Sequence, residues 1–319
     1  MLFINQDEVS TLLSMKSCMK VMESTLIDLA QGKATQVLRS VLAIDDENVL
    51  GQMPGYLKKN GVLGTKVITV FPNNHKHGLP SHQGVVLLFN AKNGELMAVV
   101  DGSEITAIRT AAVSALATDK LSRVNSKILC LLGTGTQAKT HLEAMLTVRP
   151  IELVKIWSRN IRNANQFKEE MQQKFKVSII LCDTAEEAAL DADIICTVTS
   201  STEPILKATW VKAGAHVNAV GACKPNDREL DSELVRTSKL YVDSIESTQN
   251  ESGDYLIPLK EGVIEQNHII GEIGRLLIYK NTSRTSETDI TIFKSLGLAI
   301  EDIAAANFIY EEIVRKFND

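Results

Sequence analysis

A glycine-rich turn after an apolar segment is the strongest chemical signal in this chain. In LCLLGTGTQAKTH the apolar run 128–132 is followed by Gly133, Gly135 and Ala138. Gly133 permits a tight turn, Gly135 lets the backbone approach a pyrophosphate, and Ala138 lets the next helix touch the strand. Free N–H groups at the start of that helix favour phosphate. We therefore predict a dinucleotide site; a glycine turn without a ligand would leave the agreement of strand, spacing and helix unexplained.

The residues after the second predicted strand bear on which dinucleotide binds. An NAD site places Asp or Glu there, about 20 residues beyond the glycines, to accept from the ribose 2′-OH. Here the strand 153–157 is followed by Ser158, Arg159 and Asn160. Arg159 offers a planar fork of donors suited to a phosphate, so the sequence favours NADP(H) over NAD(H). The alternative is that Arg159 is a solvated surface charge.

These residues must be positioned by strands and helices, and the sequence predicts two regions with different arrangements of them. Beyond about residue 127, helical segments separate predicted strands at 128–132, 153–157, 177–181, 194–198, 216–220 and 240–242. This alternation is typical of βαβ units. The first third instead predicts a helix over 7–30 and short strands such as 62–70 and 84–89, separated by turns like FPNNHKHGLPSHQG. We predict an α/β protein: a Rossmann-type doubly wound parallel sheet plus an α+β substrate and dimerisation domain.

One helix is expected to join the two domains. Small and apolar residues recur at helical spacing over 104–121, and we place the boundary inside this segment. The predicted domains are 1–115 and 116–295. A strand-like ITIF and a turn at 295–297 precede a final helix over 298–317, which is expected to return to the first domain and so adds 296–319 to it.

Composition excludes several classes of protein. The 319 residues are 44% hydrophobic and 23% charged, as in soluble folded proteins. Because 34 basic residues are outnumbered by 39 acidic ones, nucleic acid and anionic membranes are disfavoured as partners. Five cysteines without a C-x-x-C pair are expected to be reduced thiols, and no secretory signal or spanning segment is visible. We expect a cytoplasmic protein; its one close histidine pair, His75-x-His77, is more typical of a polar loop than of a metal site.

Three cations of the first domain, Arg39, Lys66 and Arg109, lie beside predicted turns or helix ends. Taken singly, each is more typical of a solvated surface charge. Together with other motifs, however, their segments resemble the ornithine cyclodeaminase/mu-crystallin family over essentially the whole chain, and most closely its mu-crystallin or ketimine reductase branch. The motifs are MPGY, PSHQG, DGSEITAIRTAAVSA, GTGTQA, TEPI, NAVGACKPNDREL, ESGD and FKSLGLAIED.

This resemblance implies roles for individual residues. Arg39, Lys66 and Arg109 would be the catalytic residues and would hold a substrate carboxylate, while Cys223 would contact the substrate or be a spectator thiol. His82 would lie near the nicotinamide or be an ordinary turn residue. The full set of implied cofactor contacts is Ser81, His82, Arg109, Gly133, Thr134, Gly135, Thr136, Gln137, Ser158, Arg159, Asn160, Asn163, Thr199, Val220 and Ser295. The resemblance also implies a homodimer.

Two positions depart from the cyclodeaminase pattern. Gly51 stands where cyclodeaminases have Glu, two residues before the Met of the M-P motif, and Cys223 stands where they have Asp. Neither residue can orient a side-chain amine or shuttle protons as a carboxylate does. We therefore expect NADPH-dependent reduction of cyclic ketimines, of the Δ1-piperideine-2-carboxylate or Δ1-pyrroline-2-carboxylate type, to cyclic amino acids. Alternatives are ornithine cyclodeamination, an alanine-type amino-acid dehydrogenase, and a non-catalytic, thyroid-hormone-binding protein like the mu-crystallins.

Overall fold

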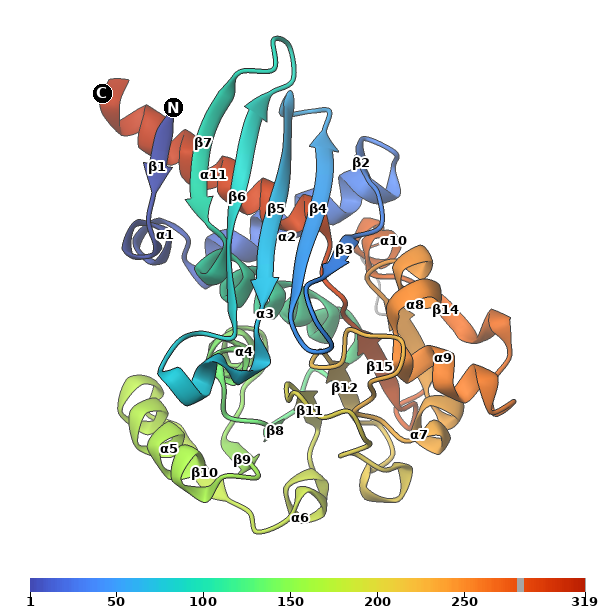
Figure 1. Cartoon of the computed structure of the whole chain (residues 1–319). Helices are drawn as coiled ribbons and strands as arrows, with labels where there is room; N and C mark the ends of the chain where they lie inside the picture. Colours follow the sequence, from blue (N-terminus) through green and yellow to red (C-terminus); the bar gives the residue numbers. More distant parts are fainter. Residues whose placement is uncertain (280–283, 319) are drawn as a thin grey trace. The chain divides into compact units, whose positions relative to one another are not determined.

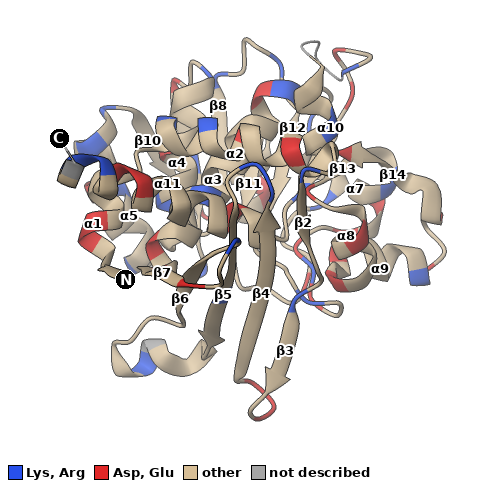
Figure 2. Cartoon of the chain, turned by 90° about the horizontal axis from the view of Figure 1, so that it is seen from above, with Lys and Arg blue, Asp and Glu red and all other residues tan. Residues whose placement is uncertain are grey.

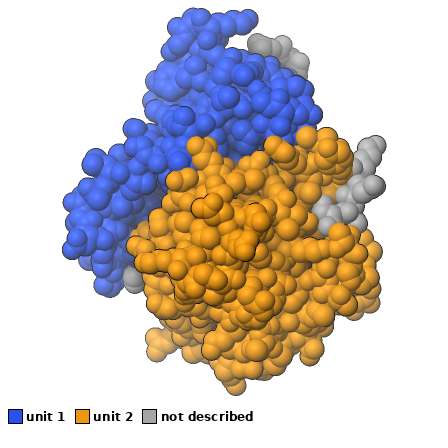
Figure 3. All heavy atoms as spheres, turned by 90° about the vertical axis from the view of Figure 1, so that its right-hand side faces the viewer, with its two compact units in different colours: residues 1–112, 297–319 blue, residues 113–296 orange. Residues whose placement is uncertain are grey.

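The computed structural model describes residues 1–279 and 284–318, and the chain forms two compact units (Figure 3). Unit 1 contains Met1–Ala112 and Gly297–Asp319, and unit 2 contains Val113–Leu296. Unit 1 is therefore made of two stretches of the chain that are separated in sequence by the whole of unit 2. These limits lie close to the domain boundaries expected from the sequence. The roles expected for the two domains, substrate binding with dimerisation and dinucleotide binding, stay predictions.

Unit 1 is built on a mixed sheet (Figure 1). The strand order is β1-β7-β6-β5-β4-β2, with β3 also paired to β4, and all pairings are antiparallel except β1 with β7. The helices α2 and α11 contact each other, and α11 also contacts β4, β5 and β6. The elements are β1 (Leu2–Ile4), α1 (Gln6–Leu12), α2 (Met15–Ala30), β2 (Ala34–Gln36), β3 (Ser40–Ala43), β4 (Val49–Leu57), β5 (Val62–Val70), a 3-10 turn (Pro72–His77), β6 (His82–Asn90), β7 (Leu96–Asp101), α3 (Gly102–Leu121, which ends in unit 2) and α11 (Ala299–Asn318).

The single opening helix predicted over 7–30 is wrong, because the segment forms two helices. Leu13 leaves helical geometry with φ −103° and ψ 78°. The Ser14 side chain then accepts a hydrogen bond from the Ser17 N–H and caps a new helix. Ser14, which lies within a helical pattern of apolar residues, therefore begins a second helix and does not continue the first.

Register in the sheet places Lys66 on the face that α11 covers. Lys66 pairs with Met53 on β4 and with Val86 on β6, and all three are buried. In the next row Gly55 pairs with Gly64, and a Cβ on either would meet Ile303 of α11, at 3.0 Å and 3.2 Å respectively. These glycines let α11 pack directly on the sheet beside Lys66.

Unit 2 has the parallel sheet expected from the sequence. All eight strands are parallel, in the order β10-β9-β8-β11-β12-β15-β13-β14, so the α/β fold class with a Rossmann-type sheet is confirmed. The elements are β8 (Ile128–Leu132), α4 (Thr136–Val148), β9 (Leu153–Trp157), α5 (Ile161–Phe175), β10 (Ser178–Leu181), α6 (Ala185–Ala189), β11 (Ile194–Thr197), a 3-10 turn (Ala208–Trp210), β12 (His216–Ala219), α7 (Ser232–Thr237), β13 (Lys239–Val242), α8 (Ile245–Glu251), α9 (Gly253–Lys260), a 3-10 turn (Gln266–His268), β14 (Ile269–Glu272), α10 (Ile273–Ile278) and β15 (Thr291–Lys294).

The strand order brings the ends of distant segments together. The chain order reverses between β8 and β11, and open α/β sheets bind ligands at the carboxyl ends of the strands at such a point. The late strand β15 inserts between β12 and β13, so residues near 295 lie beside those near 219. The sequence did not predict this insertion or the strand β14.

Charges and thiols complete the description. Figure 2 shows basic and acidic residues interspersed along the helices. Cys18, Cys130, Cys182 and Cys196 are buried free thiols, and Cys223 is partly exposed. Within the described ranges, no helix combines the length and the apolar character that crossing a membrane requires.

Candidate functional site

The glycine turn of unit 2 is tightly packed at Gly133 and open at Gly135. Gly133 follows β8 with φ +117°, and a Cβ there would meet the Val198 carbonyl oxygen at 2.8 Å. Gly135 caps α4, and its missing Cβ would point into open space, with no atom within 4 Å. Thr136 and Gln137 form the first turn of α4, and Ala138 is fully buried. The turn thus leaves room beside its backbone for a ligand.

The turn after β9 lies against this glycine turn. The Thr134 hydroxyl donates to the Ser158 hydroxyl at 3.2 Å. Asn160 caps α5, because its side-chain oxygen accepts from the N–H groups of Arg162 and Asn163. Arg159 is exposed. Asn160 therefore shapes the turn that presents Arg159.

The residues expected near the nicotinamide follow three neighbouring strands of the same sheet. Thr199 follows β11, Val220 follows β12, and Ser295 follows β15. Val220 N–H donates to the Thr197 carbonyl, and Ser295 N–H donates to the Ala219 carbonyl, both at 3.0 Å. Cys223 lies further along the loop after β12, with its thiol 3.5 Å from the Val220 carbonyl oxygen. The structure therefore groups these four residues at one edge of unit 2.

In unit 1 the three predicted cations converge on the start of α11. Asp302 accepts from Lys66 Nζ at 2.6 Å and from Arg109 Nε at 2.9 Å. Glu301 accepts from Arg109 Nη1 at 2.9 Å. Arg39 donates to the Gly297 carbonyl at 3.3 Å. We call these five side chains (Arg39, Lys66, Arg109, Glu301 and Asp302) the cation cluster.

Gly297 is fitted to the cation cluster. Its φ is +78°, in the left-handed region that favours glycine, and a Cβ there would meet Arg109 Nη1 at 2.5 Å. The turn before α11 therefore packs its backbone directly on the guanidinium that its helix binds.

Sequence reasoning missed Glu301 and Asp302. Both are fully buried, on a helix whose neighbouring residues are mostly apolar. Two adjacent acids inside such a segment were the available signal, because buried carboxylates are rare unless paired.

Burial and neighbouring charges tune the two ends of the Lys66–Asp302 pair in different ways. Burial lowers the pKa of Lys66 to about 8; Asp302 opposes this shift, and Arg109 and Arg39 add to it. Burial disfavours the ionised form of Asp302, yet the charges of Arg109 and Lys66 outweigh burial and hold its pKa below the usual value. Three positive and two negative formal charges sum to +1 in the cluster, which favours an anionic ligand such as a carboxylate.

His82 differs in burial from two histidines of unit 2. His82 is exposed at the start of β6, with Nδ1 3.0 Å from the Ser81 hydroxyl. His141 and His216 are buried in unit 2, where burial lowers their pKa to about 4 and about 3. In the described part of the chain, no three His, Cys, Asp or Glu residues gather as metal ligands would.

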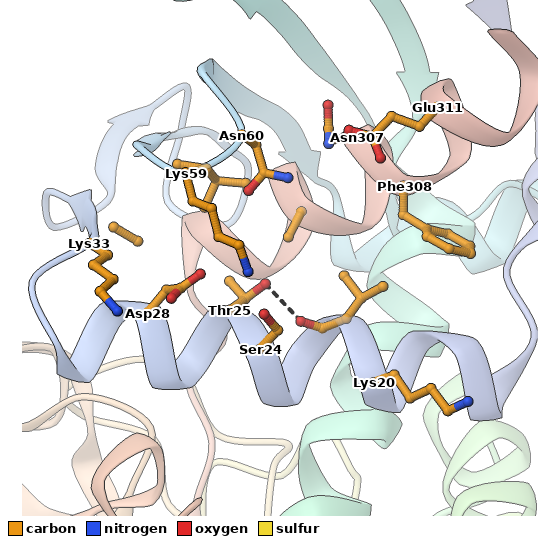
Figure 4. Close-up of a pocket in the computed structure, with 14 residues that line it drawn as sticks. Lys20, Ser24, Thr25, Asp28, Lys33, Lys59, Asn60, Asn307, Phe308 and Glu311 are labelled. Carbon is orange, nitrogen blue, oxygen red and sulfur yellow. Dashed lines mark hydrogen bonds between the residues drawn. The ribbon is translucent and has the colours of Figure 1, made fainter. Parts of the chain in front are cut away.

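A separate groove of about 240 Å³ opens in unit 1 between α2, α11 and the turn after β4 (Figure 4). Its cations, Lys20, Lys33 and Lys59, are solvent-exposed, and Thr25 is satisfied by the Val21 carbonyl. No member of the cation cluster lines it. Exposed lysines hold anions weakly, so the buried cluster is the stronger candidate site.

A parallel sheet with Gly-x-Gly-x-x-Ala after its first strand defines unit 2 as a Rossmann-type dinucleotide-binding fold. Residues 1–316 match the model of the ornithine cyclodeaminase/mu-crystallin family, and the chain belongs to this family.

Similar proteins cover almost the whole chain. A ketimine reductase mu-crystallin of Rattus norvegicus is 40% identical over 314 residues, which are 97% of this chain and 96% of the relative. A Δ1-pyrroline-2-carboxylate reductase of Thermococcus litoralis, solved with NADH and L-proline, is 40% identical with a TM-score of 0.97, over 99% of this chain and 98% of that one. An archaeal alanine dehydrogenase dimer with bound NAD is 33% identical with a TM-score of 0.93, over 99% and 97%.

The shared carboxylate of Asp302 predicts a large stability effect. Asp302→Ala leaves Lys66 and Arg109 buried without the anion that both contact. We expect the free energy of unfolding, measured in urea, to fall by about 3–5 kcal/mol. Glu312→Gln, which breaks a more exposed pair with Arg315 on the same helix, should cost less than about 1 kcal/mol. Equal losses in the two variants would contradict the assignment.

Proposed function

We propose that this protein reduces cyclic ketimines, of the Δ1-piperideine-2-carboxylate or Δ1-pyrroline-2-carboxylate type, to cyclic amino acids with a reduced nicotinamide dinucleotide. The observation that carries the proposal is the buried cation cluster, in which Lys66 and Arg109 share Asp302. The names of the Rattus norvegicus and Thermococcus litoralis relatives support the same reaction.

The substrate carries a carboxylate next to its C=N bond, and the cluster suits both groups. Arg39 and Arg109 would hold the carboxylate by charge-assisted hydrogen bonds and so fix the adjacent carbon. The dihydronicotinamide would supply a hydride to that carbon. The electron pair of the C=N bond moves to the nitrogen, which carries a proton. Lys66, with a pKa of about 8, is protonated at neutral pH and would keep the imine nitrogen protonated.

Two residues argue against cyclodeamination. Gly51 is buried within β4, and Cys223 presents a thiol on the loop after β12. Cyclodeamination needs carboxylates at these positions to handle an amine and its protons, whereas reduction of a preformed imine does not.

Two alternatives use the same cations. An alanine-type dehydrogenase would bind the carboxylate of pyruvate, and the archaeal neighbour makes this the second candidate. A hormone-binding protein would bind an iodothyronine carboxylate and would show no turnover. Substrate trials therefore separate the three.

We further propose that the cofactor is NADP(H). Arg159 is exposed after β9, beside Ser158 and Asn160, and no Asp or Glu stands between 158 and 163. A 2′-phosphate would meet donors and no like charge there. Ser81 and His82, which lie together at the start of β6, remain proposed cofactor contacts.

A homodimer through the unit 1 sheet is also proposed. In the described part of unit 1, α2 and α11 lie on one face of the sheet, and no helix covers the other (Figure 1). That face carries paired apolar residues, Val67 with Val85 and Leu87 with Val99. Open faces of antiparallel sheets are normally polar, so this face fits a second copy.

The buried free thiols fit a cytoplasmic location.

The first test is a substrate panel. Wild-type protein should oxidise NADPH with both cyclic ketimines and release no ammonia from ornithine, as followed by the absorbance of the reduced nicotinamide. The reduction rate should fall as pH rises through about 8, because Lys66 loses its proton. Asp302→Asn should move this fall to lower pH, because Asp302 raises the pKa of Lys66.

Rapid conversion of ornithine to proline, with inertness toward every ketimine, would overturn the proposal in favour of cyclodeamination. Turnover of pyruvate with ammonia alone would favour the dehydrogenase.

The cofactor preference is tested by fluorescence titration of NADPH and NADH. Arg159→Ala should weaken NADPH binding by about 1.5–3 kcal/mol, the range for a hydrogen bond to a charged group, and leave NADH unchanged. Lys168→Ala, which removes a cation further along α5, is the control. An unchanged preference for NADPH in Arg159→Ala would show that Arg159 does not bind the phosphate.

Assembly is tested by sedimentation at micromolar concentration. The wild type should sediment at twice the 35.0 kDa of one chain, and Leu87→Asp should sediment as a monomer because it places a charge in the apolar face. Lys92→Asp, in the exposed turn after β6, should leave the dimer intact. A 35.0 kDa wild-type species would contradict the proposal.

A further inference from the structure

A second buried carboxylate, Glu229, lies beneath the strand ends of unit 2. It is fully buried. One oxygen accepts from the N–H and the hydroxyl of Thr199, and the other accepts from the Thr197 hydroxyl and the Gly221 N–H, all four at 2.7 Å. A single side chain thus ties the loop after β11 to the loop after β12.

A buried ion pair holds Glu229 in turn. Asp254 accepts from the N–H groups of Glu229 and Leu230, at 2.9 and 3.0 Å. The other oxygen of Asp254 lies 2.9 Å from Lys294 Nζ, and Lys294 also donates to the Ala222 carbonyl at 2.5 Å. Glu229, Asp254 and Lys294, which we call the loop anchor, therefore connect α9, β15 and both loops.

Two glycines allow close backbone packing around the loop anchor. A Cβ on Gly221 would lie 2.1 Å from the Thr199 carbonyl oxygen and 2.6 Å from the Glu229 carboxylate. A Cβ on Gly253 would lie 2.2 Å from the Asp227 carbonyl oxygen. At Gly221 the loop after β12 packs directly on the backbone of the loop after β11, and at Gly253 the backbone of α9 packs directly on the loop after β12.

Burial makes the charge of Glu229 costly, and Lys294 and the donors around the carboxylate offset part of that cost. Burial raises the pKa of Glu229 and the charge of Asp254 adds to this shift, while Lys294 and the two threonine hydroxyls oppose it. Two of the four donors are backbone N–H groups, one at each oxygen, which cannot reverse direction. A carboxylate suits this arrangement, whereas an amide would turn its NH₂ group toward one of the N–H donors.

We propose that the loop anchor is a positioning device that sets the orientation of the nicotinamide for hydride transfer, without touching the cofactor. This inference rests on the proposed function. Its basis is that the two tethered loops carry Thr199, Val220 and Cys223, the residues proposed to face the nicotinamide and the substrate. Hydride transfer requires reacting atoms about 3–3.5 Å apart, and a misplacement of about 1 Å can cost a hundredfold in rate. The adenine half of the cofactor, by contrast, would lie on Gly135 and Arg159, outside these loops.

Glu229→Gln tests the loop anchor because it keeps the shape of the side chain and removes one acceptor. With ketimine and NADPH saturating, kcat should fall by about 10–100-fold, and the deuterium isotope effect with C4-deuterated NADPH should increase. The affinity for 2′-phospho-ADP-ribose, which lacks the nicotinamide, should stay within about twofold of the wild type. Thr197→Val removes one hydroxyl donor to Glu229 and should change kcat and the isotope effect in the same direction, by a smaller amount. This milder variant tests the loop anchor even if Glu229→Gln does not fold.

Two controls separate positioning from stability. Phe167→Leu disturbs the core of the same unit on α5 and should lower the thermal midpoint with no change in the isotope effect. Glu233→Gln breaks an exposed pair with Arg236 and should resemble the wild type. The inference is overturned if Glu229→Gln behaves as Phe167→Leu does, or if it loses affinity for 2′-phospho-ADP-ribose as strongly as it loses kcat.

The emission of bound NADPH provides a readout that does not require turnover. Glu229→Gln should shift this emission relative to the wild type, because the nicotinamide environment changes. If the wild type reduces no ketimine, the proposed function fails, while the emission shift still tests the loop anchor. Identical emission in wild type and Glu229→Gln would overturn the inference alone.

Discussion

The arrangement of unit 1 depends on one carboxylate that two buried cations share. Lys66 comes from the middle of a strand and Arg109 from α3, and both would be costly to bury without Asp302. Asp302 is presented by the first turn of α11, and α11 packs closely on the sheet where Gly55 and Gly64 carry no side chain beneath it. The position of α11, the two glycines beneath it and the pairing of the buried charges therefore depend on one another.

The dinucleotide unit was largely predictable because its rules are local. The strands β8 and β9 and the first residue of α4 lie where the apolar runs and the glycine spacing placed them. The insertion of β15 between β12 and β13 was not predictable, because a strand's neighbours depend on long-range packing that periodicity does not encode. The break at Leu13 was missed because serine fits both a helix surface and a helix cap.

For the cation cluster, sequence reasoning singled out the cations and missed the anions that position them. Arg39, Lys66 and Arg109 lie in separate segments, and the structure brings them to one cluster. Their partners Glu301 and Asp302 look like surface acids of a terminal helix unless the burial of that helix is known. The same holds for Glu229, whose partners are mainly backbone and hydroxyl groups with no sequence signature. Buried carboxylates that position other groups can therefore be identified only from the three-dimensional structure.

The two-part construction of unit 1 has a consequence for synthesis on the ribosome. The strands of unit 1 emerge first, the whole of unit 2 follows, and α11 is made after both. Until α11 emerges, Lys66 and Arg109 lack Glu301 and Asp302, so burying these two cations would leave their charges uncompensated. Unit 2 has a continuous sequence and can fold while it is being made. The nascent amino-terminal sheet therefore lacks both its covering helix and the carboxylate partners of Lys66 and Arg109 until α11 has been made.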